Sequence, residues 1–176
     1  HRLHNINCVY CRNTLDKASL TKEHVIGRKF VPKGMLDGQW NLIANACMAC
    51  NSHKSDLEDD ISAITMQPDA TGRHVSNDEI LSQEAMRKGK GAFSQMTGKA
   101  VRDSHQTITL TAEQPGFKMS FGLIAPPQIG SERVARLAYY HVTGFFFMQT
   151  YKEETKIGGC PFGVFCPVIE ADRADW

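Results

Sequence analysis

The chain has 176 residues, of which 41% are hydrophobic and 22% are charged, and these values are typical of a soluble globular protein. It is long enough to bury a core of its own, and no apolar run reaches the ~18 residues that a membrane-spanning helix needs. Integral membrane proteins are therefore excluded. No secretory signal is visible, so we expect a cytoplasmic protein, and the start at His1 instead of Met suggests a piece of a longer chain.

The formal net charge is only +1, but the charges are unevenly distributed along the chain. Residues 1–55 contain eight Lys or Arg and three Asp or Glu, and the acidic residues Asp56, Glu58, Asp59 and Asp60 follow. A basic N-terminal third suits the phosphate backbone of a nucleic acid. A solvated surface of mixed charge would give the same count.

Hydrophobic periodicity and turn residues divide the N-terminal third into short elements. The predicted elements are a tight turn at 8–11, a short strand ending near 23–26, a loop over 31–38, a second short strand over 40–43 and a helix over 47–66. Leu57, Ile61 and Ile64 recur at helical spacing within that helix, and Pro68 ends it.

The rest of the chain predicts more helix and one hairpin. The expected elements are a helical region over 76–103 capped by Ser76 or Asn77 and broken near Gly89 and Gly91, strands over 107–111 and 117–124 joined at Pro115-Gly116, and a helix over 131–151. The tail predicts a loop that could include one strand. The fold class is therefore α+β, with a site-bearing module at 1–68 and a mixed helix and β-hairpin extension at 69–176.

Four of the six cysteines form two Cys-x-x-Cys pairs, Cys8 with Cys11 and Cys47 with Cys50. This spacing is poor for a disulfide within each pair but lets four thiolates converge on one zinc ion. A site with four cysteines leaves no open position for water, so we predict a structural Zn²⁺. Cys160 and Cys166 stand apart, and we expect them to be unpaired.

Further polar residues lie between and after these pairs: Glu23-His24, Asn41-Leu42, Asn51 and Lys54. In this order and spacing, the chain through about residue 54 resembles the HNH nucleases that carry a four-cysteine zinc site. The resemblance implies a ββα-metal fold and a divalent-metal-dependent endonuclease that hydrolyses DNA phosphodiester bonds. It also implies Mg²⁺ or Mn²⁺ as the catalytic ion, in addition to the structural zinc.

The roles that the resemblance implies can be assigned residue by residue. Glu23 and Asn51 would bind the catalytic metal, and His24 would be the general base that activates water. Asn41 would orient the histidine, with Asn45 as its competitor for that position. Lys54 would contact the phosphate. His53 is an additional candidate for substrate binding, although its position two residues after Asn51 favours a side chain that faces solvent.

The chemistry of phosphodiester hydrolysis asks for the same residue types. A neutral imidazole can accept a proton from water at pH 7, and Mg²⁺ prefers carboxylate and amide oxygens. Because neighbouring strand residues point to opposite faces, Glu23 and His24 cannot both simply face inward. Either a bulge or strand end turns them, or the two contact one phosphate from different sides. The sequence departs from the family pattern at Glu23, where Asp is usual, and near Gly27, where a proline is common.

Two other functions fit the same residues. The chain could be a catalytically silent zinc module that binds nucleic acid, or a protein-interaction module that binds none. The retention of Glu23, His24 and Asn51 argues against the first, and the basic N-terminal third argues against the second. DNA is therefore the predicted partner. A homodimer or a larger parent assembly is possible, since a double-strand break needs two active sites.

Overall fold

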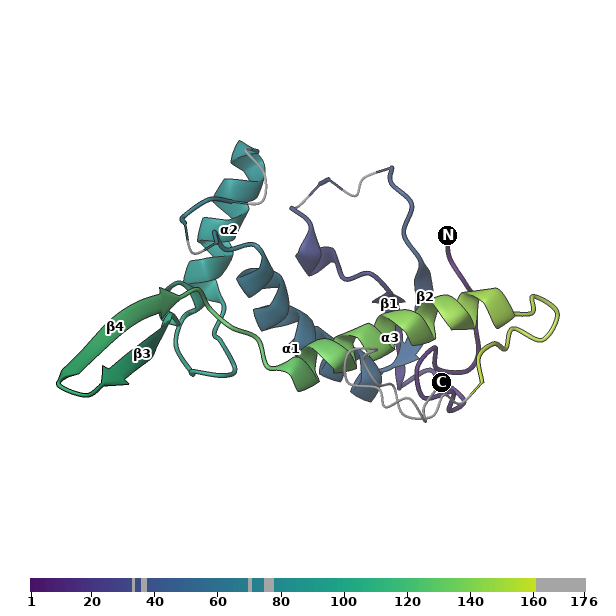
Figure 1. The fold of residues 1–176 in the computed structure, drawn as a ribbon. Coiled ribbons are helices and arrows are strands. Elements are labelled where there is room, and N and C mark those ends of the chain that lie inside the picture. Colours follow the sequence, from purple (N-terminus) through teal and green to yellow (C-terminus); the bar gives the residue numbers. More distant parts are fainter. Residues whose placement is uncertain (33, 36–37, 70, 75–77, 161–176) are drawn as a thin grey trace. The chain divides into compact units, whose positions relative to one another are not determined.

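The structure is a computed structural model that describes residues 1–32, 34–35, 38–69, 71–74 and 78–160. The chain forms two compact units (Figure 1). The first contains residues 1–58 and the chain from Ser131 onward, and the second contains residues 59–130. The sequence analysis placed a boundary at residue 68 instead. The long C-terminal helix belongs to the first unit because its Tyr140 packs on Tyr10.

The first unit is built on an antiparallel hairpin of β1 (Leu20–His24) and β2 (Ile43–Cys47). The register is regular throughout and pairs Leu20 with Cys47 and His24 with Ile43. The short 3₁₀ turn η1 (Arg28–Phe30) lies in the connection between the strands. Helix α1 (Met48–Thr65) begins directly after β2, which confirms the helix predicted over 47–66 to within one residue at each end.

The position of β2 corrects the sequence prediction, which placed the second strand over 40–43. Trp40 lies outside the strand and is exposed, whereas Ala44 and Ala46 are buried on its inner face. Alanine has a low strand propensity, so the sequence does not mark this segment as a strand. The burial of the two alanine side chains in the core of the first unit outweighs the low strand propensity of alanine.

Helix α3 (Ser131–Thr150) confirms the helix predicted over 131–151 and packs on the N-terminal elements. Its Leu137, Tyr140 and Phe147 are buried. Gly144 lies directly against Val25. A Cβ atom added at position 144 would come within 2.8 Å of the Val25 Cγ2 atom. A glycine in mid-helix is unfavourable by itself, and here it permits this close approach.

The second unit contains the end of α1, then α2 (Glu79–Gly91), the 3₁₀ turn η2 (Val101–Asp103) and the hairpin β3 (Gln106–Gln114) and β4 (Phe117–Ala125). A small core of Ala63, Ile64 and Val101 holds it together. The hairpin confirms the predicted strands, which extend by a few residues, and Gly116 takes a φ of 84° in the turn.

The start of α2 also corrects a prediction. Asp78 is the N-cap, and its carboxylate accepts hydrogen bonds from the amides of Ile80 and Leu81. Ser76 and Asn77, the predicted caps, lie outside the described residues, as does Cys166. Within the described part of the chain, no helix combines the length and the apolar character that crossing a membrane would require.

Candidate metal centre and histidine site

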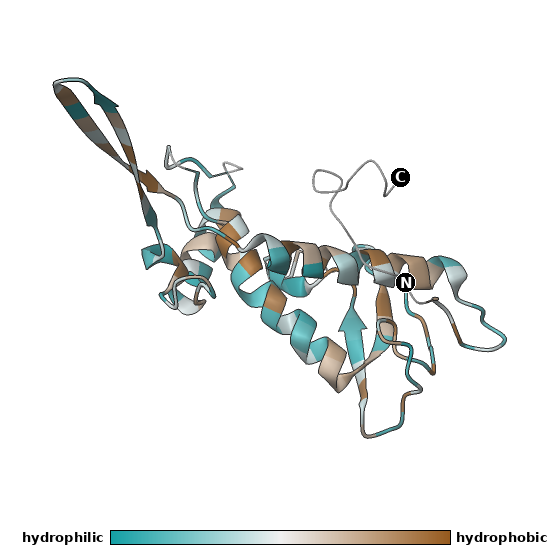
Figure 2. Ribbon diagram, turned by 60° about the horizontal axis from the view of Figure 1, so that its bottom comes forward, coloured by the Kyte–Doolittle hydropathy of each residue, from teal (hydrophilic) through white to brown (hydrophobic). Residues whose placement is uncertain are grey.

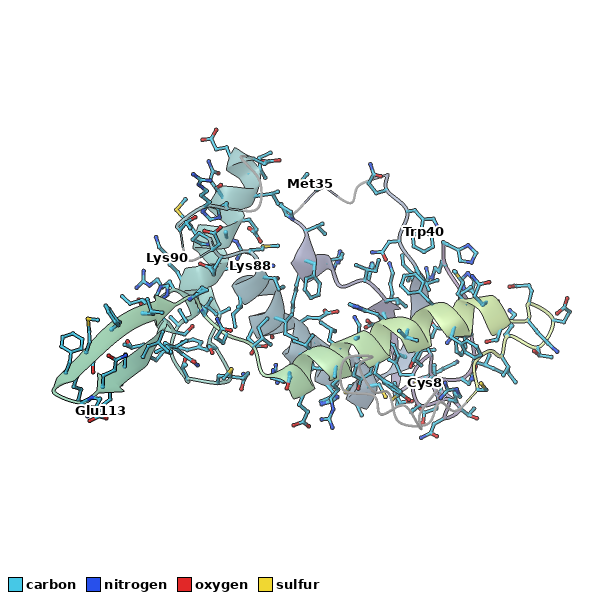
Figure 3. The ribbon with its side chains drawn as sticks, viewed as in Figure 1. Cys8, Met35, Trp40, Lys88, Lys90 and Glu113 are labelled. Carbon is cyan, nitrogen blue, oxygen red and sulfur yellow. The ribbon has the colours of Figure 1, made fainter. Side chains whose placement is uncertain are left out.

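The four cysteines of the two pairs come together in the first unit, and their Sγ atoms all lie within 4.8 Å of one another. Cys8 and Cys11 come from the turn before β1, Cys47 ends β2, and Cys50 lies in the first turn of α1. Figure 3 labels Cys8. The Sγ atoms of Cys11 and Cys47 are 3.8 Å apart. A tetrahedron with Zn–S bonds of ~2.3 Å has edges of about 3.8 Å, so the cluster is consistent with a zinc site.

Backbone hydrogen bonds hold Cys8 and its sulfur in place. Arg12 adopts a φ of 64° and its amide donates to the Cys8 carbonyl oxygen, which closes the turn. The amides of Tyr10 and Cys47 donate to the Cys8 Sγ at 3.4 and 3.3 Å. A hydrogen bond from the Cys50 thiol, together with these backbone donors, holds the pKa of Cys8 far below its usual range. Cys8 is thus ready to bind a cation as a thiolate.

Glu23 belongs to a buried ionic network that Tyr10, a residue of the Cys8–Cys11 turn, connects to the cysteine cluster. Its Oε1 is 2.8 Å from the Lys54 Nζ and accepts a hydrogen bond of 3.1 Å from the Tyr10 hydroxyl. Lys54 also pairs with Glu58 and donates to the His24 carbonyl oxygen at 3.1 Å. Burial raises the pKa of Glu23, and the positive charge of Lys54 partly opposes that rise.

This network contains two carboxylates and one ammonium group, all of them buried. The Lys54 side chain is only 1% exposed, so the charge that was expected to contact phosphate points into the protein. Tyr10 and Glu58 also belong to the site and were not among the residues predicted from the sequence. The spacing of Lys54 and Glu58, four residues apart on one helix, was the signal that could have identified the second of these.

His24 follows Glu23 at the end of β1, and the regular strand turns its side chain to the other face. The bulge that would bring both inward is therefore absent from this strand. His24 is half-buried, and burial lowers its pKa, with further lowering by the positive charges of Arg28, Lys22 and Lys54. Both effects favour the neutral imidazole over the imidazolium.

Asn41 and Asn45 have different surroundings. Asn41 precedes β2, and its Nδ2 donates to the Ile26 carbonyl oxygen at 3.4 Å. Its buried Oδ1 accepts no hydrogen bond from the residues that the structure describes. Asn45 instead exchanges hydrogen bonds with Asn5 in both directions, at 2.7 and 2.8 Å. Asn45 thereby fixes the N-terminal segment to β2, while Asn41 lies next to the segment that follows His24.

Asn51 and His53 project from the first turns of α1 in different directions. The Asn51 Nδ2 donates to the Thr21 Oγ1 at 3.0 Å, on the strand face that also carries Glu23. The His53 Nδ1 lies 2.8 Å from the Tyr140 hydroxyl of α3, and its Nε2 is 3.5 Å from an Arg136 nitrogen. The structure thus brings Glu23, Lys54 and Asn51 to one face of β1, and His24 to the other.

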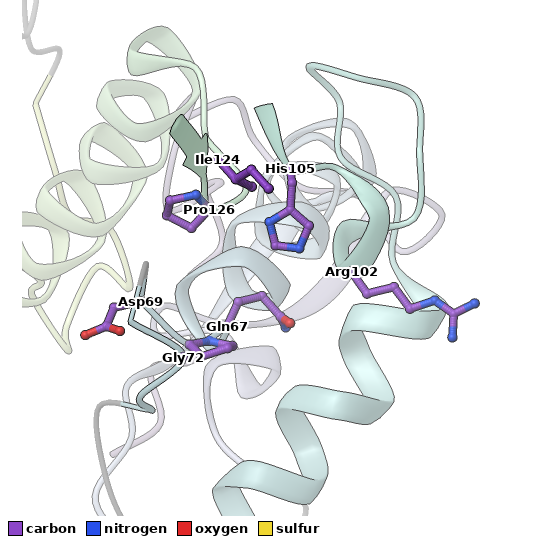
Figure 4. A pocket seen from close by; sticks show the side chains of 8 residues that line it. Gln67, Asp69, Gly72, Arg102, His105, Ile124 and Pro126 are labelled. Carbon is purple, nitrogen blue, oxygen red and sulfur yellow. The ribbon is translucent and has the colours of Figure 1, made fainter. Parts of the chain in front are cut away.

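The second unit contains a cavity of about 310 Å³ (Figure 4). Its lining residues are Gln67, Pro68, Asp69, Gly72, Arg102, His105, Ile124 and Pro126. None of the site residues predicted from the sequence lines it, so the candidate chemistry lies entirely in the first unit.

Comparison with protein-family models, with curated proteins and with solved structures gave no match. The candidate site is therefore defined by its own geometry: a four-cysteine cluster, a buried ionic network around Lys54, and a half-buried histidine at the end of β1.

Proposed function

We propose that the chain is a divalent-metal-dependent endonuclease of the HNH type that hydrolyses DNA phosphodiester bonds. The observation that carries this proposal is the setting of His24, a half-buried imidazole beside three positive charges. The order of an antiparallel strand pair and a helix, with four cysteines where they meet, supports the ββα-metal arrangement that the sequence resembles.

His24 has the properties of a general base. Burial and the cations around it disfavour the protonated ring, and the neutral ring has a nitrogen that can accept a proton from water. Lys22 and Arg28 flank His24 and are exposed, and exposed cations attract the phosphate backbone. The same two residues would therefore bind the substrate and, in addition to burial, lower the pKa of His24.

The oxygen atoms of Glu23 and Asn51 fit a hard divalent cation. The described hydrogen bonds use Oε1 of Glu23 and Nδ2 of Asn51, which leaves Oε2 and Oδ1 as the ligand atoms. Lys54 already faces Glu23, but it shares its charge with Glu58. Glu58 can therefore remain paired with Lys54 when Glu23 binds a metal ion. Because Glu23 and His24 lie on opposite faces of β1, the two would act on one phosphate from different sides. Mg²⁺ or Mn²⁺ bound by Glu23 would neutralise charge that develops on the phosphoryl oxygens.

Cleavage of supercoiled plasmid DNA in the presence of Mg²⁺ or Mn²⁺ tests this proposal. We expect nicking by the zinc-loaded wild type, and a loss of at least ~10² in rate for His24→Ala, the usual scale for a general base. His4→Ala is the matched control, because His4 is exposed and lies outside the site. Omission of Mg²⁺ and Mn²⁺, without a chelator that would also strip zinc, is expected to abolish cleavage. Equal rates for wild type and His24→Ala would refute the assignment.

A catalytically silent nucleic-acid-binding module is the second candidate. The ion pair between Glu23 and Lys54 favours it, because an ammonium group 2.8 Å from a carboxylate competes with a metal for that ligand. This function predicts a DNA complex in a gel-shift assay without cleavage under any metal condition. If the protein neither cuts nor shifts DNA, a protein-interaction module is the function that remains.

A further inference from the structure

The β3–β4 hairpin of the second unit has one apolar face and one polar face. Its register pairs Ile108 with Leu123, Leu110 with Phe121, and Ala112 with Met119 across the strands, and directly paired residues share a face. Together with Phe117, these residues form what we call the apolar face. Figure 2 shows hydrophobic and hydrophilic residues alternating along both strands.

The opposite face has a different composition. It consists mainly of polar residues: Thr107, Thr109, Thr111, Glu113, Lys118 and Ser120, with Gly122 and Ile124. Thr111 and Ser120 lie within hydrogen-bond distance of each other at 3.3 Å, and Glu113 pairs with Lys118 at 3.8 Å. Figure 3 labels Glu113 near the turn. Both charged residues near the turn belong to this polar face.

The apolar face is exposed to solvent. Its six large side chains, Ile108, Leu110, Phe117, Met119, Phe121 and Leu123, are each between 38% and 58% exposed. A two-stranded hairpin without a packed face is at best marginally stable in water, and contiguous exposed apolar patches of this kind mark interaction sites. The apolar face of the hairpin is therefore a candidate interaction surface.

We propose that a second copy of this chain covers the apolar face, so that two hairpins pack face to face around a two-fold axis. The face contains no charged residue among positions 106–114 and 117–125 that point to it. A nucleic acid or an acidic or basic partner would find no complementary charge there. An identical apolar face is complementary, because one contact then covers the exposed surface of both copies.

The area supports a stable contact. If about half of each large side chain of ~200 Å² is exposed, the face offers on the order of 600 Å² per copy. Two such faces would bury about 1,200 Å², which reaches the lower end of specific protein interfaces. The paired hairpins would form a four-stranded sandwich with sheets about 10 Å apart. This inference does not depend on the proposed nuclease activity, and the two can fail separately.

Sedimentation velocity over a concentration series of the zinc-loaded chain tests the dimer. We expect a species of twice 19.6 kDa, with a dissociation constant in the micromolar range or below, about the affinity of interfaces at the lower end of the size range. The variant Leu110→Ser/Phe121→Ser is expected to raise that constant at least ~100-fold. The matched control is Ile124→Ser, which makes an apolar-to-serine change on the polar face and is expected to shift the constant less than ~3-fold.

Far-UV circular dichroism and zinc content verify that each variant is folded. As a second measurement, a photoreactive phenylalanine analogue at position 121 is expected to cross-link two copies, and the same analogue at position 111 on the polar face is not. A wild type that stays monomeric at about 100 μM would overturn the proposal. So would equal cross-linking from both positions, which would indicate pairing through the strand edges, or binding of the monomer to lipid vesicles through residue 121.

Discussion

The carboxylate of Glu58 fills the space beside the Cα atom of Gly27. A Cβ at position 27 would collide with the Glu58 Oε1 and Oε2 atoms, and Glu58 is held there by its ion pair with Lys54. The backbone of Gly27 has φ −63° and ψ 135°, which any residue can adopt and which suits a proline. Glycine at position 27 therefore avoids a collision with a carboxylate that is fixed in place by Lys54.

We predict that Gly27→Ala destabilises the protein by about 1–3 kcal/mol, the usual cost of overpacking a filled site. Urea denaturation of the zinc-loaded protein measures the change. Gly91→Ala is the control, because its Cβ would meet no atom within 4 Å, and its stability is expected to stay equal or to rise slightly. Equal losses in the two variants would show that the contact with Glu58 does not matter.

The second prediction concerns Lys54. Because its ammonium group is buried between Glu23 and Glu58, Lys54→Met leaves two buried carboxylates without their cation and should cost about 3–5 kcal/mol of stability. Lys22→Met removes an exposed lysine and should change stability by no more than about 0.5 kcal/mol. If Lys54→Met instead weakens DNA binding and leaves the denaturation midpoint unchanged, the phosphate-contact role inferred from the sequence is the better description.

The parts of the fold that the sequence predicts are those encoded locally. The turn at Pro115-Gly116 requires a positive φ that glycine supplies, and its flanking strands alternate with period two. The helices α1 and α3 are marked by their own apolar periodicity. In contrast, β2 contains Ala44 and Ala46, whose strand conformation depends on what packs over them, and local propensity does not encode that.

The candidate site likewise has parts that the local sequence predicts and parts that depend on contacts between distant residues. The Cys-x-x-Cys spacing predicts a zinc site, and the convergence of the two pairs follows from the tetrahedral ligand geometry of zinc. Whether Lys54 faces solvent or the interior depends on Tyr10 and Glu23, which are distant in the sequence. Within the first unit, the packing of α3 on the N-terminal elements is equally non-local, because it depends on the contact between Gly144 and Val25. Contacts of this type are not visible in a single sequence.

His141 of α3 gives a prediction of pH dependence. Burial, with a contribution from Lys54, lowers its pKa from 6.5 to about 4, and its buried Nε2 has no hydrogen-bond partner among the described residues. The unfolded chain therefore binds this proton more readily than the folded protein. Stability is fully present above pH 6.5 and is lost as the pH falls toward 4, by up to about 3 kcal/mol from this group.

The variant His141→Leu removes this titration and a polar atom without a partner. We expect it to be more stable than wild type at acidic pH, with the difference growing between pH 6.5 and pH 4 in urea denaturation. His4→Leu, at an exposed position, should follow the wild-type curve. A difference between His141→Leu and wild type that is the same at both ends of this pH range would contradict the assignment.

The four-cysteine cluster predicts how zinc binding responds to ligand loss and to pH. Cys47→Ser removes one of four ligands and should weaken zinc affinity by more than ~10²-fold, since changes to the surroundings of ligands alone cost 10–100-fold. Cys160→Ser, at an exposed cysteine outside the cluster, should bind zinc as wild type does.

The pKa of Cys50 is raised because its thiol donates a hydrogen bond to Cys8, and burial raises the pKa of Cys11. Zinc must displace these protons, so its affinity should rise from about pH 6 to pH 8. Competition with a chromophoric chelator measures both effects, and a pH-independent affinity would mean that the cysteines are not the ligands.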